Sequence, residues 1–225
     1  MRKHRGFTLI EMGIAAAVLA TISALAIAGL RGVRQRGSFA SATGDVIGGL
    51  RLARAEASGR GQAVYYIIDT NVATDSLGNP LKPRWWVLLD VGGNFDFTLW
   101  DPENPMSLGD KVVSSGIFPL NVSISAPSGY PQALPAPYTL IPVAGSSIPA
   151  NPAFCSFCLT SGARINYGWV RFAPGAAPSA TFSGSNASAF GQQLTVYTSS
   201  GSKNFMMVVG ILARSGAIFS TPQAL

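Results

Sequence analysis

The only two cysteines of the chain, Cys155 and Cys158, have a Cys-x-x-Cys spacing that can support three kinds of chemistry. A thiol–disulfide redox pair usually sits at a helix start that lowers one thiol pKa, whereas here the neighbours include Pro152 and Phe154. A tetrahedral zinc site needs two further ligands, whereas the chain has no other cysteine and a single histidine, His4. We therefore expect a small structural disulfide in an oxidising compartment, with free thiols as the alternative.

Two short acidic stretches are candidates for binding calcium, which prefers oxygen ligands. The first surrounds Gly92-Gly93 and contains Asp90, Asn94 and Asp96. The second contains Asp101, Glu103 and Asp110. The same residue types also form ordinary turns, because Asn and Asp side chains bond to nearby backbone groups. The sequence leaves calcium binding and turn formation open in both stretches.

Four basic residues in the carboxy-terminal third of the chain are candidates for DNA contact: Arg164, Arg171, Lys203 and Arg214. Phosphate binding requires clustered cations, and the sequence does not say whether these four share a face. Solvated surface charge is the alternative interpretation. The formal net charge of +6 permits a polyanionic partner without requiring one.

Glu11 is the single formal charge in an apolar run over residues 7–30, which follows the basic stretch Arg2–Arg5. A helix over this run is about 36 Å long, enough to cross a hydrocarbon layer of about 30 Å. The basic stretch would remain on the cytoplasmic side. An acidic side chain within such a span costs up to roughly 3.5 kcal/mol, so Glu11 is a candidate functional residue that needs a cationic partner.

The residues around Glu11 resemble the class III signal of type IV pilins and type II secretion pseudopilins: a short basic leader, Gly6, then Phe-Thr-Leu-Ile-Glu from Phe7. The resemblance implies that a prepilin peptidase cuts after Gly6 and methylates the amino group of Phe7. It also implies that Glu11 pairs with the Phe7 ammonium of a neighbouring subunit and sets the register of a filament. An ordinary secretory signal peptide, cleaved near Gly29, is the alternative and leaves Glu11 unexplained.

The chain beyond this signal resembles the GspH/FimT group of minor pilins and pseudopilins. The resemblance is carried by Leu50–Ala57, a Trp-led segment that ends at Asp90, Trp169–Gly175 and Arg214-Ser215-Gly216. It implies an α+β fold in which a long amino-terminal transmembrane helix packs on a mostly antiparallel two-sheet β domain.

In function, the resemblance implies a minor subunit of a type IV pilus or a type II secretion pseudopilus, acting in initiation or at the tip. Its partners would be other pilin subunits, a prepilin peptidase and an inner-membrane assembly platform. The protein would span the bacterial inner membrane once and export its carboxy-terminal domain, then join a periplasmic pseudopilus or an extracellular pilus. A DNA-binding minor pilin of a DNA-uptake system is the alternative, and a secreted β-sandwich protein is another.

The only histidine, His4, lies in the implied leader. Its removal leaves no histidine for a Ser-His-Asp or Cys-His catalytic pair or for a histidine metal site. We therefore expect an assembly subunit rather than an enzyme, with no cofactor apart from the calcium hypothesis above.

Four parts of the chain are expected to position these residues: a leader at 1–6, a transmembrane and filament-core helix at 7–30, its amphipathic continuation at 31–58, and a globular β domain at 59–225. The continuation has an apolar stripe at three- and four-residue steps, formed by Phe39, Ala42, Val46, Leu50, Ala53 and Ala57. We expect the stripe to pack on a sheet.

The β domain is expected to contain strands at Gln62–Asp69, Ile117–Ser125, Leu194–Thr198 and Asn204–Ala213, and a hairpin of Trp85–Val91 with Asn94–Trp100 around Gly92-Gly93. The Asn204–Ala213 strand is apolar enough to be buried on both faces. Prolines punctuate residues 126–163 and favour a surface excursion there, with an edge strand at Tyr138–Val143.

Overall fold

One long helix and two antiparallel sheets make up the computed structural model, which describes residues 8–70, 83–124, 155–159, 166–174, 179–182, 191–200, 203–212 and 215–223. Helix α1 runs without interruption from Leu9 to Arg60, as the sequence predicts. It ends where Gly61 adopts a left-handed φ of 66° and donates its N–H to the carbonyl of Ala57, a helix termination that suits glycine.

The chain divides into two compact units, one up to Gly37 and the other from Ser38 onward. Helix α1 contributes to both units. Its apolar residues in the first unit, such as Leu9, Leu19 and Leu25, are exposed. Its residues in the second unit share a core with the strands.

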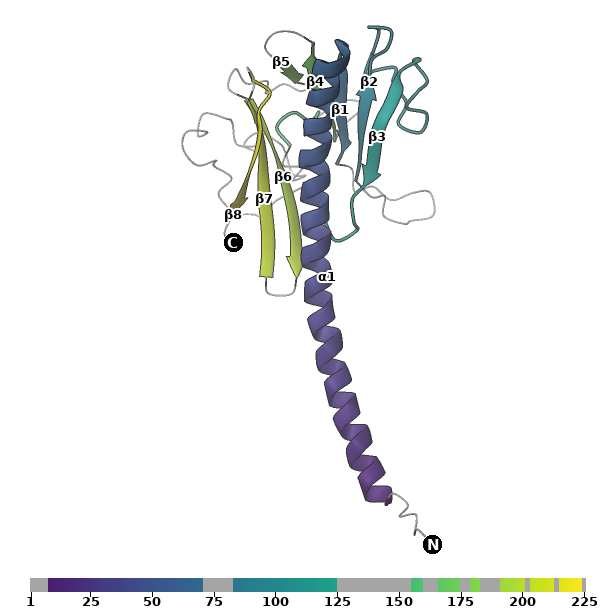
Figure 1. Ribbon diagram of the computed structural model, residues 1–225, viewed down its shortest axis with the longest axis vertical. Coiled ribbons are helices and arrows are strands. Elements are labelled where there is room, and N and C mark those ends of the chain that lie inside the picture. Colours follow the sequence, from purple (N-terminus) through teal and green to yellow (C-terminus); the bar gives the residue numbers. More distant parts are fainter. Residues whose placement is uncertain are drawn as a thin grey trace. The chain divides into compact units, whose positions relative to one another are not determined.

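The second unit contains a five-stranded and a three-stranded sheet (Figure 1). The first has the order β3-β2-β1-β4-β5 and is formed by β1 (Val64–Asp69), β2 (Arg84–Leu89), β3 (Lys111–Ile117), β4 (Tyr167–Ala173) and β5 (Ser179–Phe182). The second has the order β6-β7-β8 and is formed by β6 (Gly191–Ser200), β7 (Lys203–Leu212) and β8 (Ile218–Gln223). Neighbouring strands are antiparallel throughout, so the predicted α+β fold with two sheets is confirmed.

The main core lies between α1 and both sheets. The predicted stripe on α1 is confirmed: Phe39 is partly buried against this core and the other five members are at most 1% exposed. The stripe packs with Tyr66 and Val87 of the larger sheet and with Val196 and Val209 of the smaller one. Gly49 lets α1 approach the larger sheet closely, because a Cβ at this position would lie 2.8 Å from the Tyr66 ring of β1.

A second cluster covers the opposite face of the larger sheet. Phe97 and Trp100 come from the segment between β2 and β3 and pack on Trp86, Leu88 and Tyr65. Trp100 is fully buried, and its ring meets Trp86 edge-on at a centroid distance of 5.1 Å. The segment between β2 and β3 is therefore a lid over the sheet.

The predicted hairpin partner at Asn94–Trp100 is wrong. The carbonyl of Asp96 accepts the N–H groups of Leu99 and Trp100, and its carboxylate accepts the N–H and hydroxyl of Thr98, so this segment is a turn. The predicted strand at Ile117–Ser125 is also wrong over its described part, up to Ile124. Strand β3 ends at Ile117, and Ser123 makes an isolated bridge to Tyr197.

Other strand predictions agree with the structure. Strands β1, β6 and β7 lie at the expected positions; β6 is longer than expected, and β7 begins and ends one residue earlier than expected. Strand β7 is buried on both faces: Met206 and Val208 on one, Val209 and Ile211 on the other. The predicted edge strand at Tyr138–Val143 lies outside the described residues.

Candidate functional site

Thr8 and Glu11 form a reciprocal cap at the amino-terminal end of α1. The backbone N–H and the hydroxyl of Thr8 donate to Oε2 of Glu11 at 2.8 and 3.0 Å. In return, Oγ1 of Thr8 accepts the backbone N–H of Glu11 at 3.2 Å. This arrangement is a capping box, which satisfies backbone donors that an unfinished helix end would leave without partners.

The cap sits at the start of an apolar, exposed segment. Leu9 is 92% exposed, and Ile10, Met12 and Ile14 are exposed as well. In the described part of the chain, α1 is the one helix long and apolar enough to cross a membrane. A carboxylate is favoured at this end of a helix, because the helix dipole is positive there.

The chemistry open to Glu11 is ionic pairing. Its described contacts with Thr8 all use Oε2, so Oε1 remains able to accept from a cation outside this subunit. Gly6 and Phe7, the residues implied in cleavage and methylation, lie outside the described residues. The sequence analysis missed the role of Thr8, although Thr-x-x-Glu ahead of an apolar run is a recognised capping signal.

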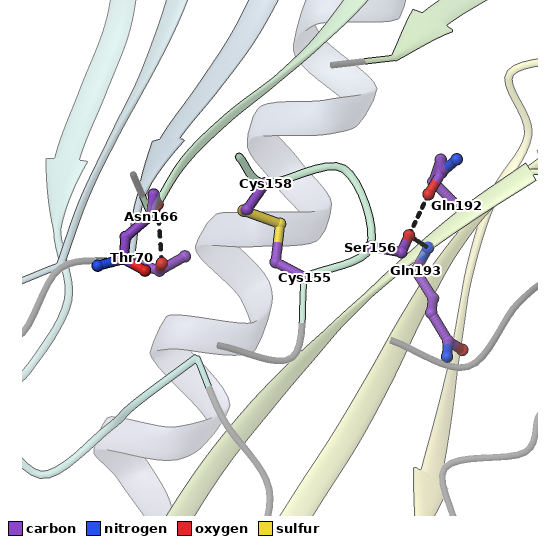
Figure 2. The surroundings of a disulfide bond; sticks show 7 residues. All are labelled: Thr70, Cys155, Ser156, Cys158, Asn166, Gln192 and Gln193. Carbon is purple, nitrogen blue, oxygen red and sulfur yellow. Dashed lines mark hydrogen bonds between the residues drawn. A yellow bond between two sulfur atoms is a disulfide. The ribbon is translucent and has the colours of Figure 1, made fainter. Parts of the chain in front are cut away.

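Cys155 and Cys158 form a disulfide, with Cα atoms 5.3 Å apart (Figure 2). Both residues are buried, at 1% and 4% exposure. Oxidised and enclosed, the pair offers neither a metal-binding thiolate nor an accessible redox pair in this state.

The disulfide loop contacts both sheets through backbone groups. Ser156 donates its N–H to the carbonyl of Gln193 in β6, and Leu159 donates to Tyr167 in β4. The Ser156 hydroxyl also bonds to the side chain of Gln192 and accepts the N–H of Gln193 (Figure 2). This loop, residues 155–159, is called the strap below.

The residues proposed from sequence for calcium do not converge. Asp90 accepts the Asn94 N–H at 3.0 Å, which is turn chemistry. Asp96 is exposed, and hydrogen bonds from the Thr98 hydroxyl and N–H lower its pKa. Among the described residues, no group of three or more His, Cys, Asp and Glu side chains could hold a metal ion.

Asp110 lies instead beside Asp90 and is 4% exposed. Burial raises the pKa of Asp110, and the neighbouring Asp90 carboxylate raises it further. The Val91 amide has a smaller effect that lowers this pKa, although it does not reach hydrogen-bonding geometry. The structure thus joins one member of each acidic stretch, a pairing that the sequence spacing alone did not indicate.

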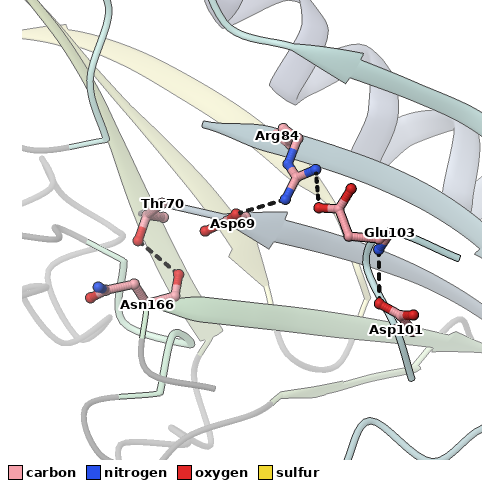
Figure 3. A network of polar contacts seen from close by, with 6 residues as sticks. All are labelled: Asp69, Thr70, Arg84, Asp101, Glu103 and Asn166. Carbon is pink, nitrogen blue, oxygen red and sulfur yellow. Dashed lines mark hydrogen bonds and ion pairs between the residues drawn. The ribbon is translucent and has the colours of Figure 1, made fainter. Parts of the chain in front are cut away.

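The other members of the second acidic stretch, Asp101 and Glu103, belong to a surface network at the start of β2 (Figure 3). Arg84 pairs with Glu103 at 2.8 Å and with Asp69 at 3.7 Å, and its guanidinium lies over the Trp86 ring. Asp101 accepts the Glu103 N–H. Burial, reinforced by Asp69, raises the pKa of Tyr167 to about 12. These contacts hold the lid to the sheet.

The basic residues proposed for DNA contact are not gathered by the described structure. Arg171 lies in β4 of the larger sheet, and Lys203 begins β7 of the smaller one. Arg171 also interacts with Tyr65 on the neighbouring strand. Arg164 and Arg214 lie outside the described residues.

A family model described as the prokaryotic N-terminal methylation motif matches residues 1–27. No curated protein and no solved structure matches the chain. The match covers Gly6 and Phe7, the Thr8–Glu11 cap and the apolar turns after it. The chain therefore carries a type IV pilin-like amino-terminal motif on a long apolar helix, which supports a processed, membrane-associated subunit that assembles with other pilin subunits.

Proposed function

We propose that this chain is a minor pilin or pseudopilin subunit of the GspH/FimT type, cleaved after Gly6, methylated at Phe7 and assembled into a type IV pilus or a type II secretion pseudopilus. It acts in initiation or at the tip of the filament. Its β domain faces the exported side of the bacterial inner membrane, and its work is assembly rather than catalysis.

The observation that carries this proposal is the capped Glu11 at the start of an exposed apolar helix within the methylation motif. A carboxylate is costly in such a segment unless a partner reduces its desolvation. The Thr8 cap gives Glu11 part of that stabilisation within one subunit. A cation from a neighbouring subunit, such as a newly formed amino terminus, provides the remainder.

The finer assignment to a minor subunit is supported by the order of elements. A single long helix leads into a domain of two antiparallel sheets, which is the fold that the resemblance to the GspH/FimT group implies. The long lid between β2 and β3 and the strap add surfaces of this chain's own, which suits a specialised rather than a repeating subunit.

The processing step is tested by the mass and sequence of the mature amino terminus. The full chain is expressed in a bacterium that contains a prepilin peptidase and is then purified in detergent. The proposal expects a chain that begins at methylated Phe7. A chain that begins near Gly29 contradicts it and indicates an ordinary signal peptide.

The role of the Glu11 charge is tested separately with Glu11→Gln. Glutamine can still complete a capping box, so the variant removes the charge and keeps the helix end. We expect normal cleavage but at least a tenfold loss of subunit from sheared filament fractions. Glu56→Gln, at the opposite end of α1, is the matched control and should assemble as the wild type does. Equal assembly of Glu11→Gln and wild type would refute the pairing.

A further inference from the structure

Asp90 and Asp110 stand opposite each other at the two ends of the lid. Asp90 follows β2 and Asp110 precedes β3, and the last register pair of these strands is Leu89 with Lys111. Continuing this antiparallel register by one position places Asp90 directly across from Asp110. Cβ atoms of such opposed residues lie about 4.5–5.5 Å apart, and like charges there are destabilising.

Both side chains are turned toward the lid rather than toward water. Each residue is 4% exposed, and by alternation they share the sheet face of Trp86, Leu88 and Val112, which the lid covers. Within the described ranges, neither carboxylate oxygen of Asp110 has a partner in hydrogen-bonding geometry. An ionised carboxylate in such a position is costly unless a cation or donors compensate it.

No ion pair among the described residues compensates Asp90 or Asp110. The ion pairs there involve the carboxylates of Glu56, Asp69 and Glu103. Two cations share this sheet face. Arg84, at the other end of β2, pairs with Glu103 and Asp69, and Arg171 lies opposite Tyr65 and interacts with it. Asp90 satisfies one oxygen with the Asn94 N–H, which fixes the turn but contributes no positive charge.

We propose that Asp90 and Asp110 bind one calcium ion at the neck of the lid. Two carboxylates supply the negative charge that a hard divalent cation requires, and backbone carbonyls and water commonly complete a calcium shell. Calcium tolerates the irregular geometry of two strand ends, whereas magnesium requires a near-octahedral arrangement. The bound ion ties the two ends of the lid together and holds Phe97 and Trp100 on the sheet.

The test uses the full-length protein in detergent, freed of divalent ions with a chelator. Calcium chloride is titrated by isothermal calorimetry, and thermal unfolding is followed with calcium or magnesium chloride. The proposal expects one calcium per chain. It also expects the midpoint temperature to rise by roughly 5–10 °C when calcium is at about one hundred times its dissociation constant. Magnesium should give a smaller rise.

Three variants locate the site. Asp110→Asn and Asp90→Asn should each weaken calcium binding at least tenfold and remove the thermal shift. Asp96→Asn is the matched control, because Asp96 belongs to the same lid but is exposed and bonded to Thr98, and it should bind calcium like the wild type.

Wild type that binds no calcium overturns the proposal. If Asp96→Asn abolishes calcium binding and Asp110→Asn preserves it, the proposal is also overturned. The calcium site would then be the exposed turn around Asp96. If Asp110→Asn does not fold, the wild-type titration and Asp90→Asn still decide the question.

Discussion

Adjacent glycines on α1 offer a direct test of how the helix meets the larger sheet. Gly48 is exposed, and a Cβ built there meets nothing within 4 Å. A Cβ at Gly49 would lie 2.8 Å from the Tyr66 ring and 3.3 Å from the Trp85 ring. Gly48→Ala and Gly49→Ala therefore make the same chemical change in the same helix, and only the second meets the sheet.

The expected magnitudes follow from two opposing effects. Replacing a helical glycine by alanine stabilises by about 1 kcal/mol, which applies in full to Gly48→Ala. Carbon atoms pack at about 3.5–4.0 Å, so the new methyl of Gly49→Ala must displace a ring. Tyr66 is fully buried, so its ring can move only against neighbouring core side chains. Overpacking of about 1–3 kcal/mol then makes Gly49→Ala neutral to about 2 kcal/mol destabilising.

Thermal unfolding of the full-length variants in detergent, followed by circular dichroism and tryptophan fluorescence, measures the difference. At about 2–4 °C per kcal/mol, Gly49→Ala should unfold roughly 2–12 °C below Gly48→Ala. Equal midpoints for the two variants would refute the described packing of α1 on β1 and β2.

Three further predictions concern the cap and the strap. Thr8→Ala should destabilise the start of α1 by about 0.5–2 kcal/mol and lower the yield of assembled filament, whereas Thr8→Ser should keep the helix start and the yield at their wild-type levels. An unchanged filament yield in Thr8→Ala would show that assembly does not depend on the cap. Reducing Cys155–Cys158 should destabilise the domain by about 2 kcal/mol, since the closed loop is short, and paired unfolding curves with and without reductant check this. Gly168→Ala places a Cβ 2.6 Å from Sγ of Cys158, so mass spectrometry after thiol labelling should find more unoxidised chain than in wild type; equal labelling contradicts the close contact.

The helix and the terminal strands could be predicted from the sequence because their patterns reflect burial directly. The stripe from Phe39 to Ala57 repeats at helical spacing, and all of it contacts the core. Strand β7 is continuously apolar, and both of its faces are covered. In these elements, local periodicity and tertiary environment agree.

The lid was wrongly predicted to contain a strand, because its alternating apolar and polar residues belong to a turn. Phe95, Phe97 and Leu99 suggest a strand, but Asp96 bonds forward to Thr98 and turns the chain, so that Phe97 and Trp100 face the same side. The true partner of β2 is β3, a polar edge strand whose Ser114, Ser115 and Gly116 give little signal.

The candidate site was predictable only in part. Glu11 was evident as a charge in an apolar run, whereas its bond to Thr8 was not predicted, although the Thr-x-x-Glu spacing carries that signal. Asp90 and Asp110 were assigned to separate stretches, because 19 residues lie between them and only the β2–β3 register brings them together.

The strap has a mechanical consequence for the β domain. Its backbone bonds run to Gln193 in one sheet and Tyr167 in the other, and its own ends are locked by a covalent bond. A force that draws β6 away from β4 must therefore break the hydrogen bonds of the strap to one of the two strands, while the disulfide keeps the strap itself closed. The strap thus adds a direct link between the sheets to the hydrophobic contacts that each makes with the helix.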